Sequence, residues 1–405
     1  MGSKWQVLVA VAVAELLAMS LWFSASAVIP QLTVEWSLDA AQQSWLTVSV
    51  QLGFVAGAVA SALTNLADRM PAHRVVQYGA VLGALANGAI AVLRPTFGVA
   101  LALRFLTGAC LAGVYPPAMK LMVSWFEHRR GMAIGVLVGA TTVGSALPHL
   151  FSVLPLFPGQ AGLPPWPAVL IAASISALVG AGIIGLWVRP GPYLPVTARF
   201  DWRQAARGFS DTALRRANFG YLGHMWELYA MWTWVPLFLL QVYRANGIGE
   251  GPARVAGFMI IAVGGLGCVV AGVVADRVGR TLVTSVSMLV SGACALVAGS
   301  LGASPWLLTA VCLLWGFAVV ADSAQFSAAV SELSDPAYVG TALTTQTAAG
   351  FLLTTLTIRL VPTAAATDGW WLALALLAVG PAFGIRAMMA LRAMPVARKL
   401  AGGRR

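Results

Sequence analysis

The sequence predicts an all-α polytopic membrane protein whose twelve transmembrane helices form two pseudo-symmetric six-helix bundles. The first observation is composition: 59% of the 405 residues are hydrophobic and 10% are charged, whereas a soluble domain is about 45–50% apolar and about 25% charged. The second is a series of apolar segments, each close to the roughly 20 residues that cross a bilayer. The third is an internal duplication at about half the chain length. The same composition excludes intrinsic disorder.

Hydropathy predicts six spans in each half of the chain. They lie at about 6–29, 45–66, 74–93, 97–122, 131–154 and 166–188, then at about 217–241, 254–275, 281–301, 304–330, 338–361 and 369–391. Six arginines and three prolines occupy residues 189–216, which is typical of a linker followed by a basic stretch at the membrane surface. We therefore predict an N-terminal bundle (1–188), a cytoplasmic basic linker (189–216), and a C-terminal bundle with a cytoplasmic tail (217–405).

The positive charges indicate the orientation, because cytoplasmic loops collect Lys and Arg. With the N-terminus in the cytoplasm, 18 of the 25 lie on the cytoplasmic side, 4 lie outside and 3 lie within spans. Both termini are therefore predicted to be cytoplasmic, in a multi-pass protein of the cytoplasmic (inner) membrane. The net charge of +11 then reflects topology. The expected partners are the bilayer, a small solute and protons, with no nucleic acid, and we expect a monomer.

Two pairs of segments support the duplication. The segment from Glu15 to Trp22 matches the segment from Glu227 to Trp234 at five of eight positions, with an offset of 212 residues. A second pair shares Ala-Asp-Arg at an offset of 208 residues. In the first pair Glu, Met and Trp stand at i, i+4 and i+7, which is one face of a helix. We therefore predict that two triplets face each other across the axis between the halves: Glu15, Met19 and Trp22, and Glu227, Met231 and Trp234.

The second pair carries a recognisable motif. Gly272-Val-Val-Ala-Asp276-Arg277-Val-Gly279-Arg280 resembles the loop motif G-x-L-A-D-R-x-G-R of the major facilitator superfamily and falls between spans eight and nine, as in that family. The first copy keeps Asp68 and Arg69, while Thr64 and Pro71 replace its glycines. The segment Arg104-Phe-Leu-Thr-Gly108 is similar to the family's span-four motif, and Trp125–Gly135 is similar to the loop that follows it.

The resemblance covers the whole chain and implies the fold of that superfamily and secondary active transport. It also implies a gate, in which Asp276 meets the start of span five near Gly131 and Asp68 meets the start of span eleven near Gly340, so that one face is held shut. The alternative is that these are turn residues that follow the positive-inside rule. The gating residues implied are Asp68, Arg69, Arg130, Gly272, Asp276, Arg277, Gly279 and Arg280.

Ionisable residues within the spans are the main functional candidates, because a charge at the bilayer centre costs at least about 2.5–3.5 kcal/mol. They lie on spans one, four, seven and ten, which line the central cavity in the family's fold: Glu15, Arg104, Lys120, Glu227 and Asp322. Proton coupling requires a group that changes charge near the solute. Glu227, with His224 on the same helical face, is the first candidate, followed by Asp322 and Glu15. A structural role for these carboxylates, paired with Arg104 or with backbone, is the alternative.

Substrate-binding candidates combine the intramembrane arginine with polar, aromatic and thioether side chains on the same spans and on span eleven. They are Arg104, Trp22, Met19, Tyr115, Met231, Trp234, Gln325 and Gln346. Packing is the alternative role for the methionines and tryptophans. Tyr115 precedes two prolines, which kink a helix, so it belongs to a site wall or a hinge.

These residues favour a secondary active transporter that takes up a small organic anion by proton-coupled alternating access, a symport. Arg104 supports an anion, and the G-P-x-x-G-G motif of drug antiporters is absent from span five. The alternative is proton-antiport efflux of lipophilic or cationic compounds, which the carboxylates and tryptophans favour. A remote alternative is a non-transporting membrane sensor. No enzyme, cofactor or metal site is predicted, because the chain lacks a P-loop, a Ser-His-Asp arrangement and metal-ligand spacing.

Overall fold

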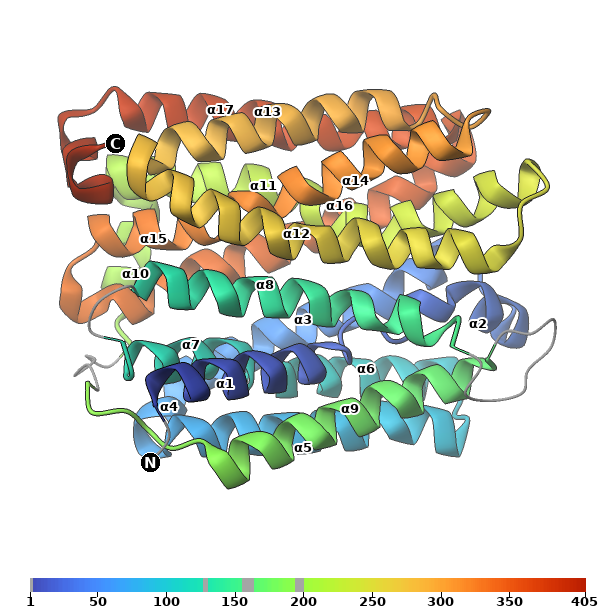
Figure 1. Ribbon diagram of the computed structural model, residues 1–405, viewed down its shortest axis with the longest axis horizontal. Helices are drawn as coiled ribbons and strands as arrows, with labels where there is room; N and C mark the ends of the chain where they lie inside the picture. The colour runs from blue at the N-terminus through green and yellow to red at the C-terminus, as the bar shows by residue number, and fades with distance from the viewer. Residues whose placement is uncertain (1–2, 127–129, 155–163, 194–199) are drawn as a thin grey trace.

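The structure is a computed structural model that describes residues 3–126, 130–154, 164–193 and 200–405. Regular structure in these ranges is helical throughout. The helices run side by side along the long axis, and both chain ends lie at the same end of the molecule, on the left in Figure 1. We call this end the terminal face and the other end the opposite face.

The first half of the molecule, the lower part of Figure 1, contains helices α1 to α9. Their bounds are α1 Lys4–Met19, α2 Ile29–Trp36, α3 Ala40–Thr64, α4 Leu66–Arg69, α5 Ala72–Leu93, α6 Phe97–Leu111, α7 Tyr115–Val123, α8 Arg130–Phe151 and α9 Trp166–Trp187. The short helix α10, Trp202–Ser210, follows. The second half contains α11 Thr212–Ala245, α12 Glu250–Val278, α13 Arg280–Ala298, α14 Pro305–Ala321, α15 Ser323–Leu333, α16 Val339–Ala375 and α17 Val379–Arg392. A 3-10 segment, η5 Pro395–Gly403, comes after α17.

Local sequence explains where several helices begin. At the start of α3, the Asp39 side chain accepts from the Gln42 amide at 2.7 Å, and the Gln42 side chain accepts from the Asp39 amide at 2.9 Å. This capping box satisfies two donors that a helix start leaves free. Ser3 and Gln6 form the same arrangement at α1. Each box fixes the residue at which the helix begins.

The helices are consistent with the twelve predicted spans. Nine segments of the described chain are long and apolar enough to cross a membrane, and one of them, 336–392, covers the last two predicted spans. Helices α1 and α11 are not among the nine: α1 has 16 residues, and α11 carries several charged or polar side chains. The family-level prediction of an all-helical membrane protein is confirmed, while the predicted domain bounds at 188 and 217 stay a prediction.

Three predicted spans are interrupted at membrane depth. Helix α1 ends at Met19, and turns follow as far as Ala25. Span four breaks into α6 and α7 ahead of Pro116 and Pro117, which lack the amide proton that a continuing helix needs. Span ten changes from α14 to α15 at Asp322. Irregular backbone at this depth occurs where it is buried in protein or lines a cavity.

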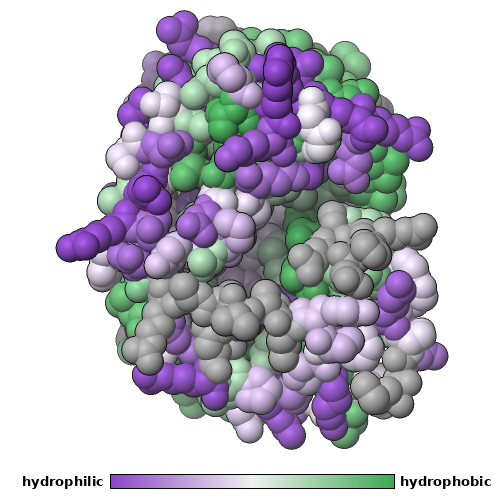
Figure 2. Space-filling model, turned by 90° about the vertical axis from the view of Figure 1, so that its left-hand side faces the viewer, coloured by the Kyte–Doolittle hydropathy of each residue, from purple (hydrophilic) through white to green (hydrophobic). Residues whose placement is uncertain are grey.

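The two halves meet along two helix pairs, α8 with α12 and α3 with α16. Gly139 and Gly265 bring α8 and α12 close together, since a Cβ atom added to either would lie 3.2 or 3.1 Å from the carbonyl oxygen of the other. Toward the opposite face, Arg254 donates to the carbonyl oxygen of Ala27 at 3.3 Å. Figure 2 shows the terminal face, which is hollowed near its centre. The halves are therefore joined toward the opposite face and open on the terminal face.

Within the first half, Gly108 allows α3 and α6 to cross closely. A Cβ atom at this position would lie 2.0 Å from the Val50 carbonyl oxygen. Gly98, on the same helix, has no atom within 4 Å of its Cβ position. Gly108 belongs to the segment identified as similar to the family's span-four motif, and its role there is close helix packing.

We expect Gly108→Ala to destabilise the protein by about 1–3 kcal/mol, because the added methyl group forces two helix backbones apart. Gly98→Ala is the matched control and should be neutral, since its methyl group enters open space. Thermal unfolding of the detergent-purified proteins measures both changes. Equal melting temperatures for the two variants would contradict the close crossing.

Candidate functional site

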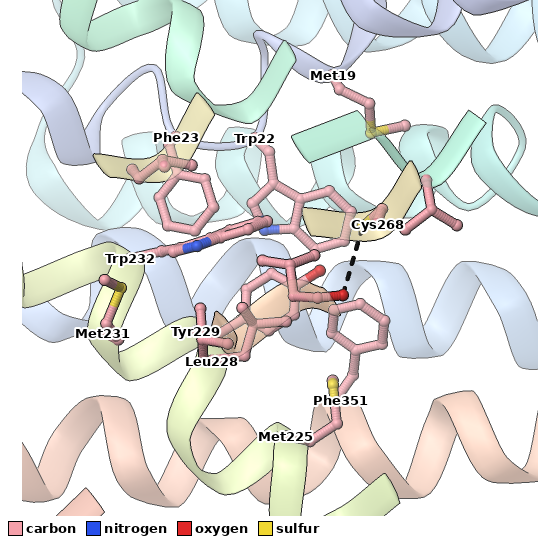
Figure 3. Packing of buried hydrophobic residues seen from close by; sticks show 14 of the residues in the cluster. Met19, Trp22, Phe23, Met225, Leu228, Tyr229, Met231, Trp232, Cys268 and Phe351 are labelled. Atoms are coloured by element: carbon pink, nitrogen blue, oxygen red, sulfur yellow. Dashed lines mark hydrogen bonds between the residues drawn. The ribbon is translucent and has the colours of Figure 1, made fainter. Parts of the chain in front are cut away.

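Four aromatic side chains from the two halves meet where α3 and α16 cross, and we call them the aromatic cluster: Trp22, Phe54, Tyr229 and Phe351. The Phe54 and Phe351 ring centroids lie 4.6 Å apart, and Trp22 lies 5.3 Å from Phe351 and 5.7 Å from Tyr229. Such distances are favourable for tilted aromatic pairs. All four side chains are buried. Figure 3 shows Trp22, from the turns after α1, converging with Tyr229 of α11 and Phe351 of α16.

Two indole groups at this cluster have no hydrogen-bond acceptor in the described part of the chain. They belong to Trp22 and Trp232, each 2% exposed. Trp232 packs against Tyr229 at 5.4 Å and against Phe23 at 5.9 Å, so both indoles flank the same tyrosine. An indole nitrogen is a donor only, and a buried donor without a partner costs about 1–3 kcal/mol. A molecule with an aromatic surface and an acceptor atom could stack on the rings and accept a hydrogen bond from an indole N–H group.

Arg104 stabilises the backbone that places Trp22 in the cluster. Its fully buried guanidinium donates to the carbonyl oxygens of Leu21 at 2.9 Å, of Leu46 at 3.3 Å and of Trp22. It also donates to the side chains of Ser24 at 3.0 Å and Asn87 at 3.1 Å. The Leu21 and Trp22 carbonyls lie in the turns after α1, where they lack the usual helical amide partner. The guanidinium is thus committed to protein oxygens, and within the described residues it pairs with no carboxylate.

Glu15 lies on α1, fully buried, one turn before that break. Its Oε1 accepts a hydrogen bond from the Thr141 hydroxyl of α8 at 2.9 Å, while its Oε2 has no partner among the residues described. Thr141 is half-buried. The carboxyl group is therefore only partly satisfied and contacts a helix that packs against the second half.

Glu227 has a different environment from its counterpart in the duplication. Its Oε2 accepts from the Ser291 hydroxyl at 2.8 Å and its Oε1 accepts from the Trp315 indole at 2.6 Å. These donors lie on α13 and α14, so the side chain points into the second half. Both carboxyl oxygens have partners, which is the arrangement of a structural hydrogen-bond network.

The predicted facing of the two duplicated triplets is wrong for the tryptophans, and also for Glu227, which points into the second half. Trp22 contacts Tyr229 and Phe351, whereas the Trp234 indole donates to the carbonyl oxygen of Ile358 at 2.8 Å on α16. The physical reason is the end of α1 at Met19, which removes Trp22 from the helical face that Glu15 and Met19 share. Helix α11 continues through all three matching positions.

His224 pairs with Asp322 and not with Glu227. Its Nδ1 atom lies 2.8 Å from the Asp322 carboxylate, and both side chains are 1% exposed. The Nε2 atom has no partner within the described ranges. The ring also packs against Phe326 at 5.5 Å. The pair therefore joins α11 to the break between α14 and α15.

The other predicted substrate residues divide between packing and polar roles. Met19 and Met231 are fully buried, and Tyr115 is half-buried at the start of α7. Both amide atoms of Gln346 lack partners in the described chain, although the side chain is 1% exposed. Gln325 accepts from Arg280 at 2.7 Å and so contacts the gating motif.

Sequence reasoning missed several residues of the site: Phe54, Thr141, Tyr229, Trp232 and Phe351. Most are apolar or aromatic residues in apolar spans, where nothing distinguishes them from packing residues. Gln51, a fully buried amide with no partner in the described structure, was also missed. An amide inside a predicted span was the one signal available for it.

In the second copy of the gating motif, the Asp276 side chain is exposed and Arg280 is held on the second half. The Asp276 side chain is 64% exposed and lies 3.9 Å from Arg280. Arg280 instead binds both carboxyl oxygens of Glu332, at 2.6 and 2.9 Å. Arg69, Gly272 and Arg277 are exposed or half-buried, whereas the side chains of Asp68 and Arg130 lie outside the described part of the chain. The predicted contacts of Asp68 with Gly340 and of Asp276 with Gly131 stay predictions.

The comparisons with known proteins agree on one family. The family model described as Major Facilitator Superfamily matches residues 11–358. Two relatives are described as MFS-type transporters: pytF of Aspergillus terreus, 24% identical over 50% of this chain, and pynF of Aspergillus niger, 25% identical over 62%. The alignments span 65% and 55% of those relatives' own lengths.

A solved structure shows the same fold. It is a bacterial homologue of the human lysosomal transporter Spinster in an inward-facing and unoccupied conformation, and it matches with a TM-score of 0.67 at 17% identity. The match covers 96% of this chain and 95% of that chain.

We expect Arg104→Lys and Arg104→Gln to lower the melting temperature, because neither side chain can donate to the carbonyl oxygens that the planar guanidinium reaches together. Each buried acceptor left without a donor costs about 1–3 kcal/mol. Thermal unfolding of both variants without any solute measures the effect. If Arg104→Lys unfolds like the unmodified chain and loses only the binding of an organic anion, Arg104 is a substrate ligand and not a backbone support.

Proposed function

The chain belongs to the major facilitator superfamily of membrane transporters, and from this premise we propose that it moves an uncharged aromatic organic solute by proton-coupled alternating access. The observation that carries the proposal is the aromatic cluster, which both halves build and which holds two buried indole donors without acceptors. A planar solute between the rings would replace ring–ring contacts with similar contacts of its own. An acceptor atom on that solute would bind the indole N–H groups.

The charge of the solute follows from the hydrogen bonds of Arg104. An organic anion, the first prediction from the sequence, needs a cation near the cluster, and the guanidinium of Arg104 already serves five protein oxygens. The unpartnered groups of Trp22 and Trp232 are neutral donors. This chemistry supports the lipophilic alternative over the anionic one, and it favours a neutral solute over a cation because an N–H donor repels a cation.

We propose that Glu15 carries the coupled proton. Its carboxyl has one free oxygen and a half-buried hydroxyl partner, and it lies one turn from the break that positions Trp22. A proton on Glu15 would therefore alter the backbone that holds the cluster. The His224–Asp322 pair is the second candidate. For Glu227, the first candidate from the sequence, the two hydrogen bonds support a structural role.

We further propose that the terminal face is cytoplasmic, in the inner membrane. The count of positive charges supports this orientation, and the open conformation would then face inward. The two halves of one chain supply the whole cluster, which supports a monomer as the transporting unit. The linker and bundle bounds predicted from the sequence are part of the same proposal.

Thermal-shift binding tests the class of solute. We expect coumarin, a neutral planar lactone, to stabilise the purified protein more than benzoate or tetraphenylphosphonium. Trp22→Phe keeps an aromatic ring but removes one N–H donor, so it should weaken coumarin binding by about 2- to 12-fold, the equivalent of one hydrogen bond of about 0.5–1.5 kcal/mol. Trp202→Phe, at an exposed tryptophan far from the cluster, is the control. Stabilisation by benzoate alone, lost in Arg104→Gln, would restore the organic-anion prediction.

Proton coupling is tested in proteoliposomes that contain a pH-sensitive dye. We expect solute-driven proton movement to be lost in Glu15→Gln, because the amide cannot carry a proton, while exchange of solute down its own gradient remains. Glu227→Gln should keep coupling but unfold at a lower temperature, since the amide has one acceptor oxygen for two donors. Loss of coupling in Glu227→Gln, with coupling retained in Glu15→Gln, would assign the proton to Glu227.

A further inference from the structure

Residues 395–405 fold back onto the loop that joins α12 to α13, which carries the gating motif. The Thr281 hydroxyl and the Arg392 guanidinium both donate to the main-chain oxygen of Arg405, at 2.7 and 2.9 Å. The Arg404 guanidinium donates to the main-chain oxygen of Asp276. Leu400 is fully buried and belongs, with Ala397, to the main hydrophobic cluster. The segment is thus held by specific hydrogen bonds and by an apolar anchor.

Gly279 of the motif is shaped to receive this segment. Its φ of +102° is a conformation that residues with a Cβ atom rarely adopt. A Cβ atom at this position would also lie 2.1 Å from the main-chain oxygen of Arg405 and 2.4 Å from that of Arg404. The glycine therefore provides both the turn between α12 and α13 and the space in which the segment docks.

The segment also binds the carboxylate that fixes Arg280. Oε2 of Glu332 accepts from the main-chain amide of Ala401 at 3.1 Å and from Arg280 Nε at 2.9 Å. Arg280 reaches Gln325 as well. One end of the segment thus binds the backbone of Asp276, and its middle binds the partner of Arg280. Both residues are held on the second half, with the Asp276 carboxylate exposed and the terminal face open.

We propose that residues 395–405 are a docking segment that binds the α12–α13 loop and, by fixing Asp276 and Arg280 there, stabilises the conformation open on the terminal face. On this proposal, closure follows the gate that the loop motif implies, in which Asp276 binds the start of α8, and the α12–α13 loop shifts on the second half, away from the contacts of Arg404 with Asp276 and of Ala401 with Glu332. Docking opposes this movement, and release of the segment favours it. The inference needs no solute and no proton, so it stands apart from the proposed substrate and coupling residue.

The test uses the full chain in lipid nanodiscs without solute. Hydrogen exchange measured on the peptide that covers 395–405 reports docking itself. Spin labels at Leu63→Cys and Ala337→Cys report the separation of α3 and the start of α16 at the terminal face, after the four native cysteines are replaced by alanine. Both label positions are exposed. The main variants are Leu400→Asp, which removes the apolar anchor, and Arg404→Ala.

Arg398→Ala is the matched control, because it removes the same charge as Arg404→Ala from an exposed position of the same segment. We expect both main variants to speed exchange of the segment at least tenfold, because Arg404→Ala removes a hydrogen bond from a charged group and Leu400→Asp places a carboxylate at a buried apolar position. The population with the short label distance should rise at least threefold in both variants. Arg398→Ala should change neither measurement.

Two results would overturn the proposal. Exchange of 395–405 at the rate of an unstructured peptide in the unmodified chain would show that the segment does not dock. Faster exchange in Leu400→Asp and Arg404→Ala with an unchanged distance distribution would show that docking does not affect the gate. A variant that lacks residues 395–405 has no docking segment, so it should show the same shift in label distance as the point variants. It controls for misfolding that the substitutions themselves could cause.

Discussion

The hydrogen bonds from Arg104 to the carbonyl oxygens after α1 are the interaction on which the site depends. A helix that stops at membrane depth leaves carbonyl groups without amide partners, and in an apolar surrounding each one is costly. One planar guanidinium supplies donors to Leu21, Trp22 and Leu46 together. The chain can therefore turn after Met19, and Trp22 and Phe23 reach the second half. Without this cation a continuous helix would be the favoured backbone, and the aromatic cluster would lose its first-half indole.

The same interaction explains why two related segments have different surroundings. Glu15 and Glu227 begin matching sequences, but only the first segment contains a break in the helix. Glu15 then keeps a free carboxyl oxygen beside α8, whereas Glu227 is satisfied by Ser291 and Trp315 inside the second half. The two halves share a helical frame at these positions, and a few different side chains around each glutamate give the two carboxyl groups different surroundings.

The fold could be predicted from the sequence because it follows from average properties. A break within one helix does not hide these properties: the long apolar segments, the uneven distribution of Arg and Lys, and the loop motif at Asp276. The site was less predictable. The residues from Ser20 to Ala25 contain neither glycine nor proline, so nothing local marks the break. Phe54 and Phe351 are apolar residues in apolar spans and acquire meaning only when α3 and α16 meet. Arg104 was identified as important, but three of its five partners are backbone oxygens, which leave no trace in a sequence.

The contact of Gly139 with Gly265 has a mechanical consequence. Backbone meets backbone there, with the side chains of Thr142 and Val143 packed against Gly264 and Gly265, so this close crossing is a point about which the halves can tilt. Gly139 lies near the middle of α8, which at about 1.5 Å per residue leaves roughly 14 Å of helix on one side and 18 Å on the other. A tilt of about 10° at such a fulcrum moves each helix end by roughly 3 Å in opposite directions. One tilt of the halves about this contact therefore opens one face and closes the other.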